Sequence, residues 1–545
     1  MDHLASGMMS KRRKGKQNAG GRKPKSPYSA HNVSRIGQHK LHGRKLSPPL
    51  AQIPKMTPSS WADDRMPEML WAVLLTGVLE RGHYLALLRE IAVLCRDWFK
   101  RDEAEERKVG EPDEETGLNF TVVVDHTKLA EITDERFDQF VSIPLRHPLG
   151  YAALRPLLLV ESLPGFERWK RRLDVEPVDD DWKTLAGAIA GVLDHQSEKS
   201  TDIRWFKLIL PIISGRMFFP ESMADDLEAL RLFPDKGDMR RVRPFIRSGE
   251  MTLRRNPPSP WLQDFWSELL EKTGCVDPSP KDGYAFVETV IDPEPLYATR
   301  RQVIRRFLRN LSAKRADAPL DSAFGLVLYA LAIVEEIGFH RVQTRIIGRL
   351  ALRALVEANI TLRYLAEKDS EELWNSYRVY GAGQAKLAFL KAQELEGDLP
   401  PFMDEDALYA IANEDIWQEF LDIDVGHWAN SNLRKLSIDC GAKALYDKYY
   451  HWASAFAHGH WGAIRDTNFV TCHNPLHRLH RIPRLAHRSL NSVETDAISL
   501  ANEMLGVLDR LFPGENDLGG LSLTKSVESQ PQGGDTNTTG STADE

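Results

Sequence analysis

Hydrophobic residues recur at three- and four-residue steps through most of the chain, which is the spacing of one buried face of an α-helix. A clear case is the series Tyr84, Leu87, Leu88, Ile91, Leu94, Cys95 and Trp98. The same pattern predicts helices over residues 154–159, 182–193, 203–213, 261–272, 322–337, 341–367, 371–394, 440–457 and 492–511. Residues 120–124 form a β-like run, but a lone strand cannot make a sheet. The pattern therefore predicts an all-α protein.

Polar stretches divide this helical pattern into domains, and a length of 545 residues suits two cores of about 200 to 250 residues each. Residues 1–57 and 513–545 hold too little apolar surface to order themselves, so they are predicted to be disordered tails, the first basic and the second acidic. Residues 312–319 contain no large apolar side chain and are predicted to be a linker. An N-terminal helical domain is then expected at 58–311 and a C-terminal helical domain at 320–512.

The net charge of −7 conceals an uneven distribution of charge. Residues 1–60 hold 13 Lys or Arg and one Asp, so they carry +12 and leave −19 for the remainder. Clustered cations of this kind bind the phosphates of RNA or DNA by releasing counterions. The residues predicted to do so are Lys11, Arg12, Arg13, Lys14, Lys16, Arg22 and Lys23. The alternatives are a solubilising tail, or a stretch that precedes a start codon at Met8, Met9 or Met56.

Two basic groups inside the helical domains favour the same nucleic-acid interpretation. The first group, Arg240, Arg241 and Arg243, lies beside Phe245, so it can hold phosphates and stack a base. The second group, Arg301, Arg305 and Arg309, follows one side of a helix. The buried side of that helix is predicted to be Ile304, Phe307, Leu308 and Leu311. The alternative is a solvated set of arginines that pair with acidic residues of the body.

The candidate catalytic residues lie on two predicted helices of the C-terminal domain. Arg353 and Glu357 are four residues apart on a helix that is apolar around much of its circumference, so they are expected to pair, either as a structural ion pair or in a pocket. Ser454 and His458 are also four apart, on a helix rich in aromatic residues. They are a candidate nucleophile pair or a structural hydrogen-bonded pair, since no orienting carboxylate is evident.

The histidine and cysteine pattern does not predict a metal site. Eight of the 17 histidines fall between His427 and His487, and His473, His477 and His480 have suitable spacing for metal ligands, but Pro475 argues against a helix there. The four cysteines lie far apart and form no C-x-x-C pair, so neither disulfides nor a cysteine zinc site is indicated. No metal and no cofactor are therefore predicted.

A cytoplasmic location without membrane insertion is predicted. The widely spaced cysteines suit a reducing compartment. No apolar stretch approaches the roughly 20 uninterrupted residues of a membrane span. The basic N-terminus lacks the apolar segment of a secretory signal peptide.

Several stretches resemble a family of large bacterial proteins with a C-terminal helical domain of unknown function. These stretches are WADDRMPEMLW at 61–71, LRPLLLVESLPG at 154–165, STDIRW at 200–205, the helix with Arg353 and Glu357, and SAFAHG at 454–459. The resemblance implies a helical architecture in two units and suggests a role in bacterial defence against phage. The C-terminal domain is also loosely similar to the helical ribonuclease domains of toxins, although their motif of Arg and nearby His is met only by Arg481 and His487, with Pro483 between them.

These observations predict a nucleic-acid-associated cytoplasmic protein, with the basic arm as its RNA- or DNA-binding element. One alternative is a non-enzymatic scaffold whose helices bind a protein partner. Another is a helical ribonuclease, which requires folding to bring together an Arg and a His that the linear sequence separates. Whether the protein is an enzyme stays open at this point.

Overall fold

The computed structural model confirms an all-α protein with small two-stranded sheets. The structure describes residues 36–52, 60–109, 122–215, 217, 221–253, 259–277, 289–291, 293–313, 317–396, 399–414, 416–429, 431–484 and 489–525. The predicted phosphate-binding residues from Lys11 to Lys23 lie outside these ranges. The chain divides into two compact units, Met1–Phe265 and Trp266–Glu545, and the division falls within helix α11 (Trp261–Lys272).

This division comes earlier than the linker expected at 312–319. Helix α12 (Pro293–Arg309), which was expected to belong to the N-terminal domain, packs against α13 (Ala318–Phe339) of the second unit. The buried Arg306 also forms an ion pair with Asp509 near the end of this unit. The contacts group α12 with the second unit, because a short polar connection can join two helices that share one core.

The first unit is an assembly of short and medium helices. They are α1 (Leu70–Val78), α2 (Arg81–Val109), α3 (His126–Glu131), α4 (Asp134–Leu145), α5 (Gly150–Leu154), α6 (Phe166–Leu173), α7 (Asp179–Leu193), α8 (Glu198–Ile213), α9 (Ala224–Arg231) and α10 (Met239–Thr252). Side-chain caps begin several of them: Ser197 Oγ accepts a hydrogen bond from the Ser200 amide at the start of α8. The described part of the β-like run predicted at 120–124 is a 3₁₀ turn over Val122–Val124.

The core of the first unit is centred on Trp71 of α1. Its indole Nε1 donates to the carbonyl of Val123 at 2.8 Å, and its ring contacts Phe140 and Phe206 edge-on at 4.9 and 5.7 Å. Helix α1 also packs closely on α7, where a Cβ added to Gly77 would lie 2.8 Å from Ala188 Cα. Residues 70–76 of α1 are all buried, which accounts for its largely apolar sequence.

The first unit also contains a buried network of charged side chains. Glu250 forms an ion pair with Arg65 and lies 3.7 Å from Arg204 and 3.8 Å from Lys207, which also bridges to Glu68 at 3.3 Å. Burial lowers the pKa of Arg204 to about 10, against the opposing influence of Glu250. Arg65 and Arg204 belong to the stretches 61–71 and 200–205, so both stretches contribute side chains to this buried network.

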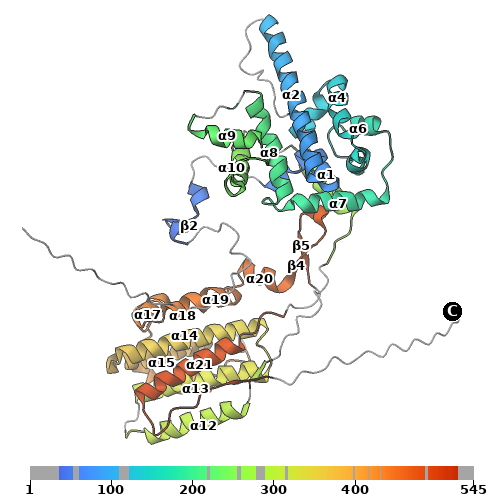
Figure 1. Cartoon of the computed structure of the whole chain (residues 1–545). Helices are drawn as coiled ribbons and strands as arrows, with labels where there is room; N and C mark the ends of the chain where they lie inside the picture. Colours follow the sequence, from blue (N-terminus) through green and yellow to red (C-terminus); the bar gives the residue numbers. More distant parts are fainter. Residues whose placement is uncertain are drawn as a thin grey trace, which may run out of the picture. The chain divides into compact units, whose positions relative to one another are not determined.

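The second unit is built on long helices that lie alongside one another (Figure 1). Its helices are α12, α13, α14 (Ile346–Lys368), α15 (Glu371–Gln393), α16 (Glu405–Ala412), α17 (Leu433–Asp439), α18 (Lys443–Leu445), α19 (His451–Ala457), α20 (Trp461–Asn468) and α21 (Glu494–Leu511). Helix α21 packs against both α13 and α14, and α14 packs on its other side against α17 and α19. Buried aliphatic residues such as Leu331, Leu355 and Leu508 form the core between them.

Among the described helices, α13 alone is long and apolar enough in composition to cross a membrane. Half of its apolar window is buried inside the second unit, where Phe324, Val327 and Val334 contribute to the core. The same composition is found in core helices of soluble proteins, and the contacts of α13 account for its apolar character.

Short antiparallel strands complete the described structure. Strand β1 (Lys40–His42) pairs with β2 (Lys45–Ser47), β3 (Thr289–Ile291) with β6 (Leu523–Lys525), and β4 (Phe469–Thr471) with β5 (Arg481–Pro483). Structure also continues beyond the expected tail boundary at 513, because Leu518 and Leu521 are buried against the second unit. Asn502 fixes this segment, accepting from the Leu521 amide at 2.7 Å and donating to its carbonyl at 3.0 Å.

Candidate functional site

Arg353 and Glu357 of α14 form an ion pair at the surface of the second unit. Arg353 Nε donates to Glu357 Oε1 at 2.8 Å, and the two side chains are 22% and 41% exposed. Burial by itself would lower the pKa of Arg353, but the hydrogen bond and charge of Glu357 outweigh it and raise the pKa above its ordinary value. The guanidinium is therefore charged, oriented by Glu357 and partly open to solvent.

A second helical segment lies against this face of α14. It runs from α18 through a π-helical turn at Tyr446–Tyr450 into α19 without a break. The wider π turn stacks the rings of Tyr446 and Tyr450 at 4.7 Å, and such turns are frequent at functional sites. It places the Tyr450 hydroxyl 3.5 Å from Arg353 Nη2, with the guanidinium carbon 5.4 Å from the ring centroid.

His458 completes this cluster from the end of α19. Its Nε2 lies 3.3 Å from Arg353 Nη1. A guanidinium can only donate, so in this contact Nε2 accepts and the ring carries its proton on Nδ1. The imidazole is exposed and lies beside His460, with 5.8 Å between the ring centroids. The exposed His458 ring and the Arg353 guanidinium therefore lie within reach of one bound ligand.

The predicted residues differ in how they enter this cluster. The structure brings Arg353, Glu357 and His458 together, as a shared site requires. Ser454 is half-buried and contacts His458 through its backbone carbonyl, which accepts from the His458 amide at 3.1 Å. Arg349, one turn before Arg353, is buried and donates to the carbonyls of Gln343 and Asn491, so it supports the chain around α14 instead of facing solvent.

Sequence reasoning did not select two members of the cluster, or two exposed tryptophans that lie close to it in the sequence. Tyr450 and His460 belong directly to the Arg353 cluster. Trp452 and Trp461 are near these residues in the sequence, and their side chains are 53% and 60% exposed. Exposed tryptophans stand out because large aromatic residues are usually covered. The density of aromatic residues from 446 to 461 was the available signal, although it gave no indication of which rings point outward.

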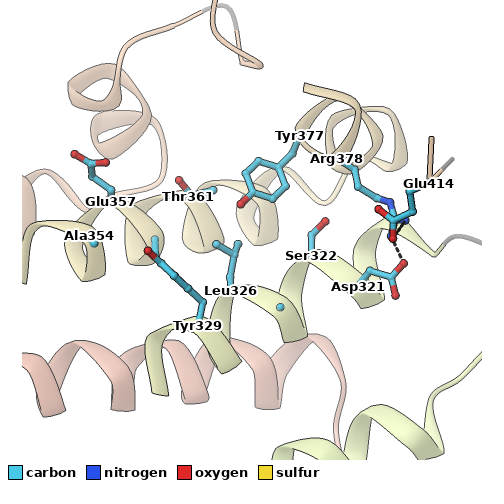
Figure 2. Close-up of a pocket in the computed structure, with 12 residues that line it drawn as sticks. Asp321, Ser322, Leu326, Tyr329, Ala354, Glu357, Thr361, Tyr377, Arg378 and Glu414 are labelled. Carbon is cyan, nitrogen blue, oxygen red and sulfur yellow. Dashed lines mark hydrogen bonds and ion pairs between the residues drawn. The ribbon is translucent and has the colours of Figure 1, made fainter. Parts of the chain in front are cut away.

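A pocket of about 480 Å³ opens beside the cluster, between α13, α14 and α15 (Figure 2). Glu357 lies at one end of the pocket, and Arg378 with its partners Asp321 and Glu414 lies at the other. Tyr329 and Tyr377 lie between these ends (Figure 2). Burial and the nearby Tyr329 raise the pKa of Tyr377, so its hydroxyl is protonated. Glu357 thus belongs both to the pocket and to the Arg353 cluster.

The arginines predicted to bind nucleic acid in the first unit have acidic neighbours. Arg240 lies 3.1 Å from Asp238, Arg241 lies 3.9 Å from Asp226, and Arg243 lies 2.6 Å from Glu198. This arrangement matches the alternative of a solvated set of paired charges, which weakens the attraction of this group for phosphates.

Helix α12 presents its predicted basic residues differently. Arg301 pairs with Glu294 at 3.0 Å, whereas Arg305 and Arg309 line a surface pocket of about 490 Å³ together with residues 513–518. The predicted buried side was wrong in part, because Ile304, Leu308 and Leu311 are 41%, 57% and 56% exposed. Val303 and Leu296 face the core instead. Helical spacing identified the element but not the side that packs.

Four histidines of the histidine-rich region lie in two separate groups. His458 and His460 belong to the cluster around Arg353, whereas His477 and His480 lie together after β4, near Cys472. His473 does not share the group formed by these last residues. Of the predicted weak motif, Arg481 donates to Thr471 and Leu479 within its own hairpin, and His487 lies outside the described residues.

No curated protein and no solved structure matches this chain. One segment of the chain matches a protein family. This segment begins within α14 and ends just after β4, so it contains Arg353, Glu357, Tyr450 and His458. It confirms the expected C-terminal domain of unknown function. Residues 348–475 match a family of unknown function (DUF5677).

Proposed function

We propose that this is a nucleic-acid-associated protein whose C-terminal unit binds and cleaves single-stranded RNA at the Arg353 cluster. The observation that carries the proposal is the approach of Arg353 Nη1 to His458 Nε2 at 3.3 Å. Arginine binds phosphate through its planar fork of donors, and histidine is the usual proton acceptor near neutral pH. Folding therefore supplies the pair of Arg and His that the linear sequence separates by about a hundred residues.

The surroundings of the cluster suit RNA more than an isolated phosphate. The exposed rings of Trp452 and Trp461 offer surfaces on which bases stack. The neighbouring pocket carries the carboxylates of Asp321, Glu357 and Glu414 against the single cation Arg378. Such a pocket repels phosphate and suits the amino and hydroxyl groups of a base or ribose, so the phosphate belongs at Arg353.

The chemistry follows from these positions. When RNA binds, Arg353 Nη1 turns from His458 to the phosphodiester, which frees His458 Nε2 to take the proton of the adjacent 2′-hydroxyl. The 2′-oxygen forms a bond to phosphorus, the bond from phosphorus to the 5′-oxygen breaks, and the leaving oxygen takes a proton from His460. The products are a 2′,3′-cyclic phosphate and a 5′-hydroxyl. Glu357 touches neither reacting atom and orients the guanidinium.

The test uses the full chain with a labelled single-stranded RNA and a DNA of the same sequence. Wild-type protein is expected to cleave the RNA to ends that carry a cyclic phosphate and to leave the DNA intact. Removal of a general base typically lowers the rate by about 100-fold or more, so His458→Ala should show a loss of this size. The matched control is Arg465→Ala, an exposed arginine on α20 outside the cluster, which should cleave like wild type.

Three outcomes contradict the proposal. Binding of RNA without cleavage by the wild type rejects the chemistry. Equal cleavage by wild type and His458→Ala, with unchanged melting temperatures, rejects the site. Absence of RNA binding rejects the function and favours a protein-interaction scaffold.

A cytoplasmic role in defence against phage belongs to the same proposal and rests on the family resemblance, so His458→Ala should also abolish any protection seen in plaque counts.

A further inference from the structure

Four side chains from distant parts of the second unit converge after α11. They are Cys275, Cys472, His477 and His480, and one possible ligand atom from each lies within 4.8 Å of all the others. Cys275 and His477 are 202 residues apart along the chain. None of the four belongs to the Arg353 cluster. Two thiols and two imidazoles gathered at one point are the ligand types of a structural zinc site.

The distances among these atoms fit a tetrahedron. Zinc binds sulfur at about 2.3 Å and imidazole nitrogen at about 2.0 to 2.1 Å, so tetrahedral ligands place sulfur and nitrogen about 3.6 Å apart. Cys275 Sγ lies 3.5 Å from His477 Nδ1 and 3.2 Å from His480 Nε2. Cys472 Sγ lies 3.6 Å from His477 Nδ1. The four atoms are already spaced for a common centre.

Hydrogen bonds from neighbouring residues orient His477 and Cys472 in the way that metal sites require. His477 Nε2 lies 2.9 Å from Thr273 Oγ1 and 3.2 Å from the Thr273 carbonyl, so this nitrogen can donate while Nδ1 is left as the ligand. The amides of Val276 and Asn474 each approach Cys472 Sγ at 3.4 Å, and N–H donors of this kind stabilise a thiolate.

The backbone around the four residues is fixed on both sides. The Cys472 amide donates to the His480 carbonyl at 2.8 Å, and the His473 amide donates to the Val276 carbonyl at 2.8 Å. Between the two histidines, Arg478 and Leu479 both adopt φ of 53°, a left-handed conformation that non-glycine residues rarely take. Backbone strain of this kind persists where the surroundings over-determine it, and a shared metal centre would do so.

We propose that Cys275, Cys472, His477 and His480 bind one Zn²⁺ in a closed structural site. The ion adds to the hydrogen bonds that join the chain after α11 to the residues around the β4–β5 hairpin. Two soft thiolates and two imidazoles favour zinc over magnesium or calcium, which prefer oxygen ligands. With all four positions taken by the protein, no open position is left for a substrate, so the site is structural.

The proposal departs from the prediction that the chain holds no metal. That prediction rested on the absence of a C-x-x-C pair and on Pro475. The structure supplies the missing second cysteine from residues that sequence spacing cannot connect, and the histidines act from a loop, where Pro475 begins a short 3₁₀ turn instead of breaking a helix.

The first test measures zinc in the full-length protein purified under reducing conditions. Elemental analysis is expected to give one zinc ion per chain in the wild type, and His480→Ala should lose most of it. The matched control is His473→Ala, a neighbouring histidine outside the group, which should keep one zinc. Cys440→Ser serves as the corresponding cysteine control, because Cys440 lies elsewhere in the unit.

A spectroscopic measurement keeps the proposal testable if a variant folds poorly. Wild-type protein stripped of metal and given Co²⁺ should show the thiolate charge-transfer and visible bands of a tetrahedral sulfur-containing site, and these bands should fade on addition of Zn²⁺. The absence of these bands from metal-stripped wild-type protein after addition of Co²⁺ would overturn the proposal. So would a disulfide between Cys275 and Cys472 in protein kept reduced, or full zinc content in His480→Ala.

Discussion

Arg353 is the residue on which the candidate site depends, because it contacts Glu357, Tyr450 and His458 at once. A lysine at this position could reach one of these partners but not all three. The pair with Glu357 was expected to be enclosed by apolar neighbours, which would make its loss cost about 3 to 5 kcal/mol. The side chains are 22% and 41% exposed, so the pair contributes at most about 1 kcal/mol to stability, as surface pairs do.

His126 of the first unit makes stability depend on pH. It is buried between Trp169 and Trp261, and neither ring nitrogen has a hydrogen-bond partner within the described structure. Burial lowers the pKa of His126 to about 3. A histidine with a lowered folded-state pKa contributes stability that is complete above the unfolded value near 6.5 and is lost as the pH falls toward 3.

Urea unfolding should therefore show a loss of about 1.4 kcal/mol for the first unit between pH 7.5 and pH 5.5. In His126→Phe the buried aromatic volume is kept and the titrating group is gone, so this part of the loss should disappear. The same pH dependence in wild type and His126→Phe would show that other groups are responsible.

At the scale of elements, periodicity predicted the long helices of the second unit well. The expected ranges 322–337 and 371–394 correspond to α13 and α15, because long helices carry many independent signals. The buried side of α12 was not predictable in the same way. Ile304 and Leu308 have apolar side chains at helical spacing, yet Val303 and Leu296 face the core, a choice that depends on what α12 meets.

The candidate site was predictable only in part for a similar reason. The spacing of Arg353 and Glu357 identified their pairing, because both are on one helix. The contact of Arg353 with His458 joins residues 105 positions apart, and the π turn at Tyr446–Tyr450 that orients the second helix has no recognisable sequence signal. Long-range contacts of this kind arise from packing and cannot be derived from local pattern.

Two glycines on neighbouring helices give opposite expectations for the packing of α1 on α7. A Cβ at Gly77 would lie 2.8 Å from Ala188 Cα, whereas a Cβ at Gly187 of α7 has open space around it. Gly77→Ala should therefore lower the free energy of unfolding by about 1 to 3 kcal/mol through overpacking. Gly187→Ala should raise it by about 0.5 to 1 kcal/mol, since alanine favours helix. Thermal and urea unfolding of both variants measure this difference; equal effects would contradict the close crossing.

At the scale of the whole molecule, charge separates the N-terminal arm from the rest. Removal of residues 1–56 takes away 13 Lys or Arg and one Asp, which changes the net charge from −7 to −19. The basic groups of the first unit do not replace the arm, since Arg240, Arg241 and Arg243 have acidic neighbours. Attraction of the protein to nucleic acid over long distances should therefore depend on the arm.

Deletion of residues 1–56 is expected to weaken RNA binding at low salt and to flatten its salt dependence. Each phosphate contact with a single strand contributes about −0.7 to the slope of log K against log salt concentration, so loss of several contacts should change the slope by about 2 or more. Fluorescence anisotropy between 50 and 300 mM salt measures both quantities. An unchanged slope in the truncated protein would place the binding in the body and not in the arm.

Helix α14 contributes residues both to the Arg353 cluster and to the core of the second unit, so changes to this helix affect both. One face of this helix supplies Leu355 and Val356 to the interior, and an adjoining stripe supplies Arg353 and Glu357 to the cluster. Because each residue advances an α-helix by about 100°, one inserted or deleted residue within α14 would turn both sets away from their partners together. Descendants of this sequence can therefore exchange residues along α14 but cannot change its length between Gly348 and Leu365 without losing site and core at the same time.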